Sequence, residues 1–181
     1  MHETYVYHWK GQGFYGNTIY PLNTLKTILP SAYECEVGKY QGREWLLDVS
    51  IPALNCLWND VIHCSLMHPR LIYKTLTDIG FKHLKKSILW FEIPLKDILL
   101  FPSTIYLNNR IWQDTKILLN SDFEPVISEC VRELSAMPER NLEYYRECLA
   151  RSERPLFWKR APHLLVKGEI DTGKCQILDW Q

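Results

Sequence analysis

The sequence predicts an α+β fold in a single domain, residues 1–181. Candidate strands lie toward both ends of the chain, with helical patterns interspersed and no strict strand–helix alternation of the kind that builds a parallel sheet. The chain of 181 residues is 46% hydrophobic and 23% charged, which is enough apolar material to bury a core without disulfides or metal. We see neither an internal repeat nor a low-complexity tract.

The first candidate strand is TYVYHW, which alternates like a half-buried strand. Alternation places Tyr5, Tyr7 and Trp9 on one face and Val6 and His8 on the other. The other expected strands cover residues 43–52, 60–66, 86–94, 103–109, 163–170 and 174–180. The last two are separated by DTGK, which predicts a hairpin turn between them.

Proline and glycine mark the expected helices. The segment PLNTLKTILP predicts a short helix that starts after Pro21 and ends at Pro30, and HPRLIYKTLTDIG predicts one with His68 as its cap and Gly80 as its stop. One helical turn is expected in LKDILLFP. Two amphipathic helices are expected over residues 124–135 and 138–152.

Net charge, hydrophobic runs and cysteine spacing limit the classes of function that the chain can have. The formal net charge is zero, which argues against a broad electrostatic grip on a nucleic-acid backbone. No apolar run is long enough to cross a bilayer and no signal peptide opens the chain, so we expect no membrane partner and a cytoplasmic location. The six cysteines are scattered without a C-x-x-C pair, which is typical of reduced thiols.

The stretch WNDVIHCSLMHPRLIY gathers two histidines, a cysteine, an acid and an arginine within sixteen residues. It admits a zinc site, a Cys–His nucleophile pair, or a core strand that runs into a helix. His63 and Cys64 are adjacent on the expected strand, so their side chains point to opposite faces and cannot converge on one ion. The strand–helix interpretation is favoured, and no metal is expected.

Two single residues are candidates by placement. His8 is the histidine of the first strand, where it is either a satisfied core residue or a ligand contact. Arg43 begins an expected strand, where it is either a solvated end or a bidentate clamp on a phosphate or carboxylate. The residues alone leave both alternatives open.

The order of these segments points to one family. A strand ending in Tyr-His precedes the NTLKTILP helix and then Arg43. The NDVIHCSLMHPRLIY strand–helix unit, the WFEIPLKDIL strand and turn, and a late LLVKGEID strand follow. This order resembles the DarT-like branch of the ADP-ribosyltransferases, toxins that transfer ADP-ribose from NAD.

The resemblance implies an NAD-dependent ADP-ribosyltransferase on an ADP-ribosyltransferase-like split mixed β-sheet with flanking helices. NAD is then the substrate, and no metal is needed. The acceptor implied is DNA, RNA or protein, and a neutralising antitoxin is the implied protein partner. By this likeness His8 holds the ribose or amide of NAD, and Arg43 grips its phosphates or the reacting centre. The remaining cofactor-binding candidates are Trp9, Asn23, His63 and Tyr73.

The chain departs from the family at one position. The family's catalytic glutamate opens the late strand, where this chain has His163, and a histidine cannot supply the negative charge that stabilises an oxocarbenium-like transition state. Glu169, six residues on, is the nearest acid before Asp171. The catalytic candidates are therefore Arg43, Glu169 and His163. The alternative function is a non-enzymatic or decayed ADP-ribosyltransferase-like binding module, for which the 13% aromatic content offers interface residues.

Overall fold

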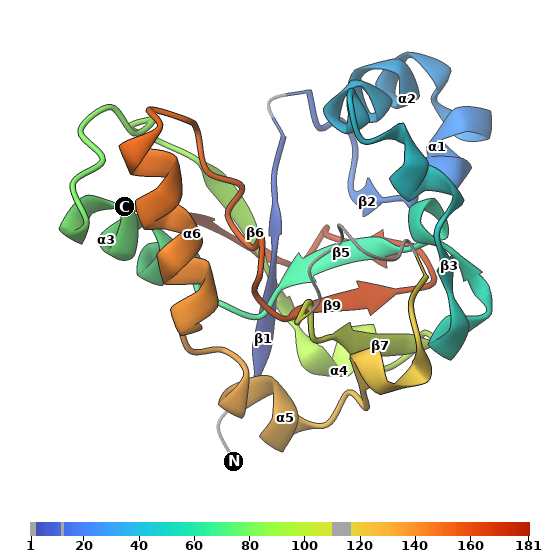
Figure 1. The fold of residues 1–181 in the computed structure, drawn as a ribbon. Coiled ribbons are helices and arrows are strands. Elements are labelled where there is room, and N and C mark those ends of the chain that lie inside the picture. Colours follow the sequence, from blue (N-terminus) through green and yellow to red (C-terminus); the bar gives the residue numbers. More distant parts are fainter. Residues whose placement is uncertain (1–2, 12, 110–116) are drawn as a thin grey trace.

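The fold is built on a seven-stranded sheet with helices beside it (Figure 1). It is seen in a computed structural model that describes residues 3–11, 13–109 and 117–181. In spatial order the strands are β11 (Gln176–Asp179), β6 (Leu89–Pro94), β1 (Tyr5–Trp9), β5 (Ile62–Ser65), β9 (His163–Val166), β7 (Ser103–Tyr106) and β8 (Phe123–Glu124). The prediction of an α+β fold is confirmed. Every strand pair among the described residues is antiparallel, so the prediction of a mixed sheet is wrong in that respect.

Two small sheets and six α-helices complete the described chain. One small sheet pairs β10 (Ile170–Asp171) with β2 (Thr18–Ile19), and the other pairs β3 (Ser50–Ile51) with β4 (Cys56–Leu57). The α-helices are α1 (Leu22–Ile28), α2 (Pro30–Val37), α3 (Pro69–Asp78), α4 (Leu95–Ile98), α5 (Ser128–Glu133) and α6 (Glu139–Ala150). The 3₁₀ turns are Gly38–Tyr40, Glu44–Asp48, Pro52–Leu54, Trp58–Asp60 and Asn120–Asp122. No helix of the described chain is both long and apolar enough to span a bilayer.

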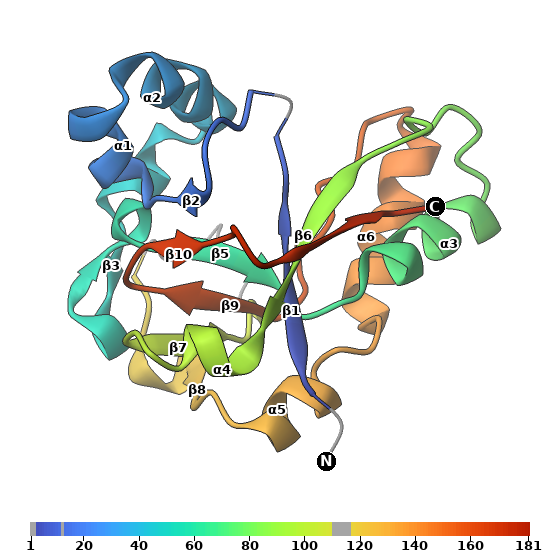
Figure 2. The ribbon, with the colours of Figure 1, turned by 180° about the vertical axis from the view of Figure 1, so that it is seen from behind.

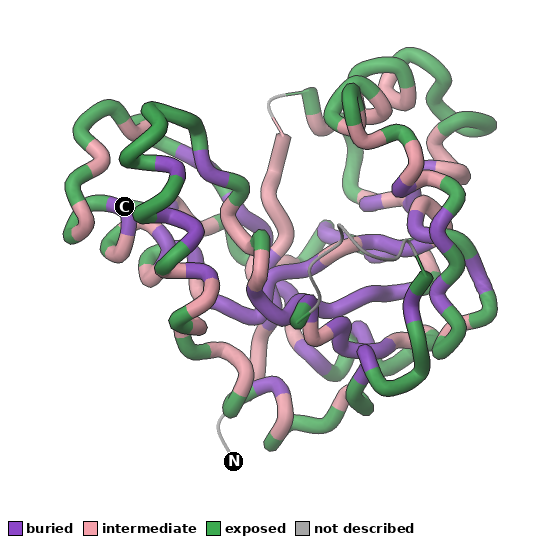
Figure 3. The backbone as a smooth tube through the Cα atoms, in the orientation of Figure 1, coloured by how far each residue is buried: buried purple, intermediate pink, exposed green. Residues whose placement is uncertain are grey.

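Alternation along the strands divides the core between the two sides of the sheet. Val6 belongs to a cluster with Cys64, Phe91 and Ile93, whereas Tyr7 belongs to a different cluster that includes residues of α3 and α6. The predicted faces of β1 are therefore confirmed. Figure 3 shows the buried residues running along the central strands, while the region of α1 and α2 is mostly exposed.

A third cluster packs residues 46–61 against β7 and β9. Its members are Leu46, Val49, Ile51, Cys56, Trp58, Val61, Tyr106, Leu118, Phe123 and Leu165. The sequence predicted a strand over residues 43–52, but half of this segment forms the turn Glu44–Asp48 and only Ser50–Ile51 is a strand. Leu46 and Val49 are buried three residues apart, a spacing that a 3₁₀ turn places on one side and a strand does not.

Three other boundaries differ from the predictions. α1 ends at Ile28, just before Pro30 as predicted, but Pro30 also starts the unpredicted helix α2, where its missing N–H is no loss. The helix expected from residue 124 begins at Ser128, because Phe123–Glu124 joins the sheet edge and Pro125 disfavours helix before it. The predicted hairpin of residues 163–180 is wrong: β9 lies between β5 and β7, and β11 pairs with β6 at the opposite edge.

The segment around α3 follows the predictions closely. The His68 ring accepts a hydrogen bond from the Arg70 backbone N–H at 3.1 Å, so His68 is the predicted cap. Gly80, with φ of 109°, ends the segment in a conformation that only glycine adopts without strain. All six cysteines are free thiols, with Cys64 fully buried on the face opposite His63.

Gly168, just after β9, has no room for a side chain. A Cβ there would lie 2.3 Å from Cδ1 and 2.7 Å from Cγ of the Phe101 ring. We expect Gly168→Ala to lower the free energy of unfolding by about 1–3 kcal/mol through overpacking. Gly38→Ala is the matched control, since Gly38 has helical φ and ψ and open space among the described residues. It should raise stability by about 0.4–1 kcal/mol. Urea unfolding of both variants checks this, and equal shifts would contradict it.

Candidate functional site

The centre of the sheet is joined by very few residues. β1 pairs with β6 along all of Tyr5–Trp9, but with β5 only through Tyr7 and Ser65. Beyond that pair β1 rises away from β5, as both ribbon views show (Figures 1 and 2). Beyond Tyr7 and Ser65 the backbones of β1 and β5 are therefore not paired with each other.

Two histidines meet beside this separation. His163 lies opposite Ser65, and His63 lies opposite Leu165, so both project from the same face of neighbouring strands. Their ring centres are 5.5 Å apart. Trp58 and Tyr106 enclose them: the Trp58 ring centre is 4.6 Å from His63 and 6.0 Å from His163, and Tyr106 is 5.4 Å from His163.

Burial keeps both rings neutral. It lowers the pKa of His163 to about 3, with a further lowering from His63, and it lowers the pKa of His63 to about 4. His163 is 3% exposed, and among the described residues its Nε2 has no hydrogen-bond partner. Burying a ring nitrogen without a hydrogen bond lowers the stability of the fold, so the presence of histidine at position 163 needs a reason.

His8 is on the neighbouring strand β1 and is electrostatically coupled to His63. Burial lowers the pKa of His8 to about 4, and the positive charge of Lys39 and the His63 ring lower it further. Its Nδ1 is buried with no partner among the described residues. His8, His63 and His163 come from three adjacent strands and are called the histidine cluster below: the rings of His63 and His163 lie side by side, whereas His8 lies on the Val6 face of β1 and is linked to His63 only electrostatically. Within the described chain, no group of three histidine, cysteine or acidic side chains is arranged to hold a metal ion.

Two cations flank the histidine cluster on the side of α2. Lys39 lies over the Trp9 ring, with Nζ 5.0 Å from the ring centre. Arg43 donates from Nη2 to the Lys39 carbonyl oxygen at 2.7 Å and is half-buried. Lys39 pairs with Glu36 on the preceding turn of chain. Trp9 and Arg43, both predicted site residues, are thereby brought to the same side of β1 through Lys39, which the sequence analysis missed.

Asn23 serves to join two segments. Its Nδ2 donates to Asp60 Oδ1 at 2.5 Å, and its Oδ1 accepts from Asn59 Nδ2 at 2.7 Å. Asp60 in turn accepts from the Leu57 backbone N–H at 2.8 Å. These bonds tie α1 to the turn that carries Trp58, so Asn23 supports the wall of the site and has its side chain already engaged.

Two predicted site residues lie elsewhere. Tyr73 is on α3, with its ring 5.3 Å from Trp180 and its hydroxyl bonded to Gln181. Glu169 is exposed and lies beyond Val166, whereas His163 is at the opposite end of β9. The structure therefore brings His63 to His163, and it brings Arg43 to Trp9 through Lys39, with His8 electrostatically coupled to both Lys39 and His63. It does not bring Tyr73 or Glu169 to them.

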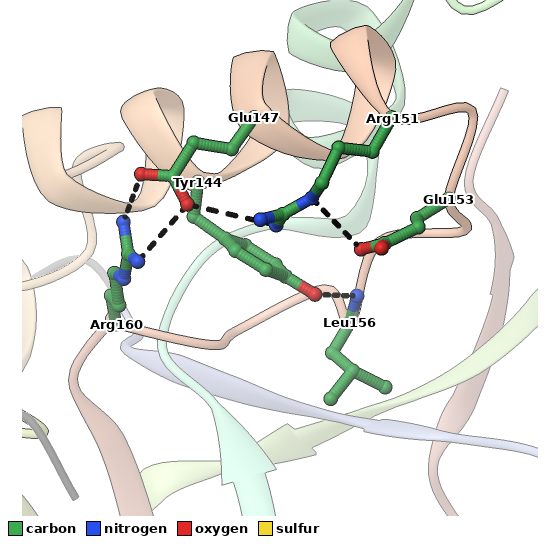
Figure 4. Close-up of polar contacts among 6 residues, drawn as sticks. All are labelled: Tyr144, Glu147, Arg151, Glu153, Leu156 and Arg160. Atoms are coloured by element: carbon green, nitrogen blue, oxygen red, sulfur yellow. Dashed lines mark hydrogen bonds and ion pairs between the residues drawn. The ribbon is translucent and has the colours of Figure 1, made fainter. Parts of the chain in front are cut away.

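Helix α6 fixes the segment that leads into β9 and His163. Asn141 Nδ2 donates to the Lys159 carbonyl oxygen at 2.7 Å, and Tyr145 donates to the Phe157 carbonyl oxygen. Figure 4 shows the outer part, where Arg160 forms a bidentate pair with Glu147 at 2.9 and 3.1 Å and Tyr144 accepts from the Leu156 N–H. The exposed ion pair contributes little, so the half-buried backbone contacts hold the segment.

A second polar contact reaches His163 from the other side. Asn108 Nδ2 donates at 3.2 Å to the carbonyl oxygens of both Trp158 and Ala161. The Ala161 carbonyl oxygen is also 3.3 Å from His163 Nδ1. Asn108 has φ of 51°, an uncommon conformation that asparagine tolerates better than most residues. No sequence motif marks Asn108, Trp58 or Tyr106 as a residue of this site.

Comparison with known proteins gives no relative for this geometry. No protein-family model matches the chain, and no curated protein or solved structure matches it either. The histidine cluster, the two cations and the aromatic rings around them are thus the basis for any functional conclusion.

Proposed function

We propose that the chain is a DarT-like, NAD-dependent ADP-ribosyltransferase that holds NAD where β1 and β5 separate. The observation that carries the proposal is that a single residue pair, Tyr7 with Ser65, joins the two halves of the sheet. His8 is on one side of this junction and His63 on the other. An ADP-ribosyltransferase-like sheet is split, and the order of segments along the chain agrees with that family.

The charges and rings suit the parts of NAD. Arg43 and Lys39 are the cations placed to bind the pyrophosphate, and a guanidinium does so with paired hydrogen bonds. Trp9 offers a ring face to the nicotinamide, and His8 contacts the ribose or amide. In the transfer, the bond between nicotinamide and ribose breaks, nicotinamide leaves with the bonding electrons, and a DNA, RNA or protein nucleophile bonds to the ribose carbon.

A second candidate is a binding module that holds NAD or a protein partner without transfer. It is favoured by the surroundings of His163: burial, His63 and the Ala161 carbonyl account for its pKa shift, and no carboxylate of the described residues contributes. Glu169 reaches this position only if the chain after β9 rearranges. Without a nearby negative charge, cleavage of the nicotinamide bond lacks a major stabilising interaction.

Thermal melting with NAD tests the proposal. A ligand present at about 100 times its Kd stabilises the native state by about 2.7 kcal/mol, which raises Tm by about 5–10 °C for a chain of this size. We expect this shift in the wild-type protein and its loss in Arg43→Ala, which should fold normally. Arg70→Ala is the matched control, because Arg70 is exposed at the start of α3.

Nicotinamide release, measured by mass spectrometry on the same samples, separates the two candidates. Release above a heat-killed control supports the transferase. A Tm shift without release supports the binding module. An Arg43→Ala protein that keeps the full shift removes Arg43 from the site, and the absence of any shift in the wild type removes NAD.

A further inference from the structure

A cavity that shares no residue with the candidate site lies where β1, β6 and β11 run side by side. Its volume is about 430 Å³, which is within the range of small-molecule sites. Side chains of these three strands line it, together with side chains from α4, from the residue Glu3 before β1 and from the turn before β11. Figure 2 shows the three strands next to one another, with α4 at the end of β6.

The charges in this cavity do not cancel. Lys96 Nζ is 2.6 Å from Glu3 Oε1, and the Tyr5 hydroxyl donates to Glu3 Oε2 at 2.9 Å, so Glu3 and Lys96 compensate each other. The other charged or amide side chains of the lining have no side-chain hydrogen bond or ion pair within the described chain: Glu92, Asp97, Lys174 and Gln176. Two carboxylates therefore face one ammonium group, and the cavity carries one uncompensated negative charge.

Glu92 is the most buried of these charges. It is half-buried on β6, the central strand of the three, whereas Asp97 and Lys174 are exposed at the rim. Burial raises the pKa of Glu92, because a carboxylate that has lost water and gained no partner is less stable in its charged form. A ligand with a positive charge would stabilise it. Gln176 is opposite Glu92 on β11, so its amide projects from the same face of the sheet.

The rim carries charges of both signs. Burial and then the charge of Asp97 raise the pKa of Cys175, the residue that follows Lys174, so Asp97 and Lys174 belong to the same part of the rim. Tyr5 and Pro94 are opposite each other on β1 and β6 and supply the apolar part of the lining. A complementary ligand has one cationic end, an apolar chain, and a second end with both an ammonium and a carboxylate group. These are the groups of a basic amino acid.

We propose that this cavity binds a free basic amino acid. The side-chain ammonium group of the ligand donates to Glu92, and its alkyl chain lies along Tyr5 and Pro94. The α-ammonium and α-carboxylate groups pair with Asp97 and Lys174 at the rim. Such an amino acid has a single net positive charge, which compensates that of the cavity. The inference goes beyond the proposed function, because it concerns other residues and holds whether or not NAD binds.

NMR titration of the protein with three small ligands tests the proposal. L-Lysine has all the required groups, norleucine lacks the side-chain ammonium group, and 1,5-diaminopentane lacks the carboxylate. Backbone amide signals around the cavity should shift and saturate with lysine. Norleucine and diaminopentane should each bind about 10-fold more weakly, the loss expected for one charged hydrogen bond.

Two variants assign the ends of the ligand. Glu92→Gln should weaken lysine binding about 10-fold and leave norleucine binding unchanged. Lys174→Gln should weaken the binding of lysine and norleucine alike and leave that of diaminopentane unchanged. Glu143→Gln, at an exposed position of α6, is the matched control and should change none of the three affinities. The amide spectrum of each variant shows that it is folded.

The absence of lysine binding to the wild-type protein would overturn the proposal, as would equal binding of lysine by wild type and Glu92→Gln. Lysine that is blocked at both α-groups represents a lysine side chain of a peptide. It should bind about 10-fold more weakly than free lysine, and equal binding would overturn the proposal in favour of a peptide ligand. Arg43→Ala should leave lysine binding unchanged, because Arg43 lies outside this lining.

Discussion

Acidification from pH 7.5 to pH 5.5 should lower the free energy of unfolding by about 4 kcal/mol, well before the carboxylates titrate. The groups responsible are His8, His63 and His163, whose pKa values burial lowers to about 4, 4 and 3. In the unfolded chain a histidine has a pKa near 6.5. The unfolded state therefore binds protons in this range, and the native state does not.

The sign follows from proton linkage. Stability falls with decreasing pH wherever the unfolded state binds more protons, and each depressed histidine contributes about 1.3 kcal/mol one pH unit below 6.5. The contribution is fully present above pH 6.5 and is lost progressively as the pH falls toward 4. The charged or titratable groups that act on these rings are Lys39 and His63 on His8, and His63 on His163.

Thermal melting across the pH range measures this. A loss of about 4 kcal/mol corresponds to a fall in Tm of about 8–16 °C for a chain of this size. His163→Phe removes one of the three groups and should remove about a third of the fall, whereas His83→Gln, at an exposed loop position, should leave the fall intact. A flat Tm between pH 7.5 and 5.5 would show that the three rings are hydrated in solution.

The sequence predicted those parts of the fold that local patterns determine. The faces of β1, the cap and stop of α3 at His68 and Gly80, and the strand start at His163 each follow from alternation or from proline and glycine nearby. The hairpin after β9 was not predictable in the same way. The turn near Gly173 does form, but it joins β10 to β11, because β9 is already paired on both edges.

The sequence could suggest which residues belong to the candidate site, but it could not predict how they lie relative to one another. Alternation could say that His63 and Cys64 point to opposite faces, which the structure confirms. It could not say that His63 would lie beside His163, since that depends on the register of two strands a hundred residues apart in the chain. Lys39 comes near Trp9 only because α2 and the turn after it fold back over β1.

Trp58 is the side chain on which the histidine cluster most depends, and Trp58→Ala should lower the free energy of unfolding by about 3–5 kcal/mol, the usual range for a buried tryptophan. Trp58 is 8% exposed and packs against His63, His163 and Tyr106. Its side chain also hydrogen-bonds Tyr40, which links the turn after α2 to this wall. Trp58→Phe keeps an aromatic ring and should lose clearly less.

The pH dependence of the same variant separates a local from a general effect. Removing the indole admits water to His63 and His163, so their pKa values should rise toward 6.5 and the fall in Tm between pH 7.5 and 5.5 should shrink. Trp180→Ala is the matched control, because Trp180 is also a buried tryptophan, 1% exposed, but belongs to the cluster that includes residues of α3 and α6. It should lower Tm by a similar amount and keep the full pH dependence. If Trp58→Ala also keeps it, the two histidines owe their low pKa values to the strands around them and not to Trp58.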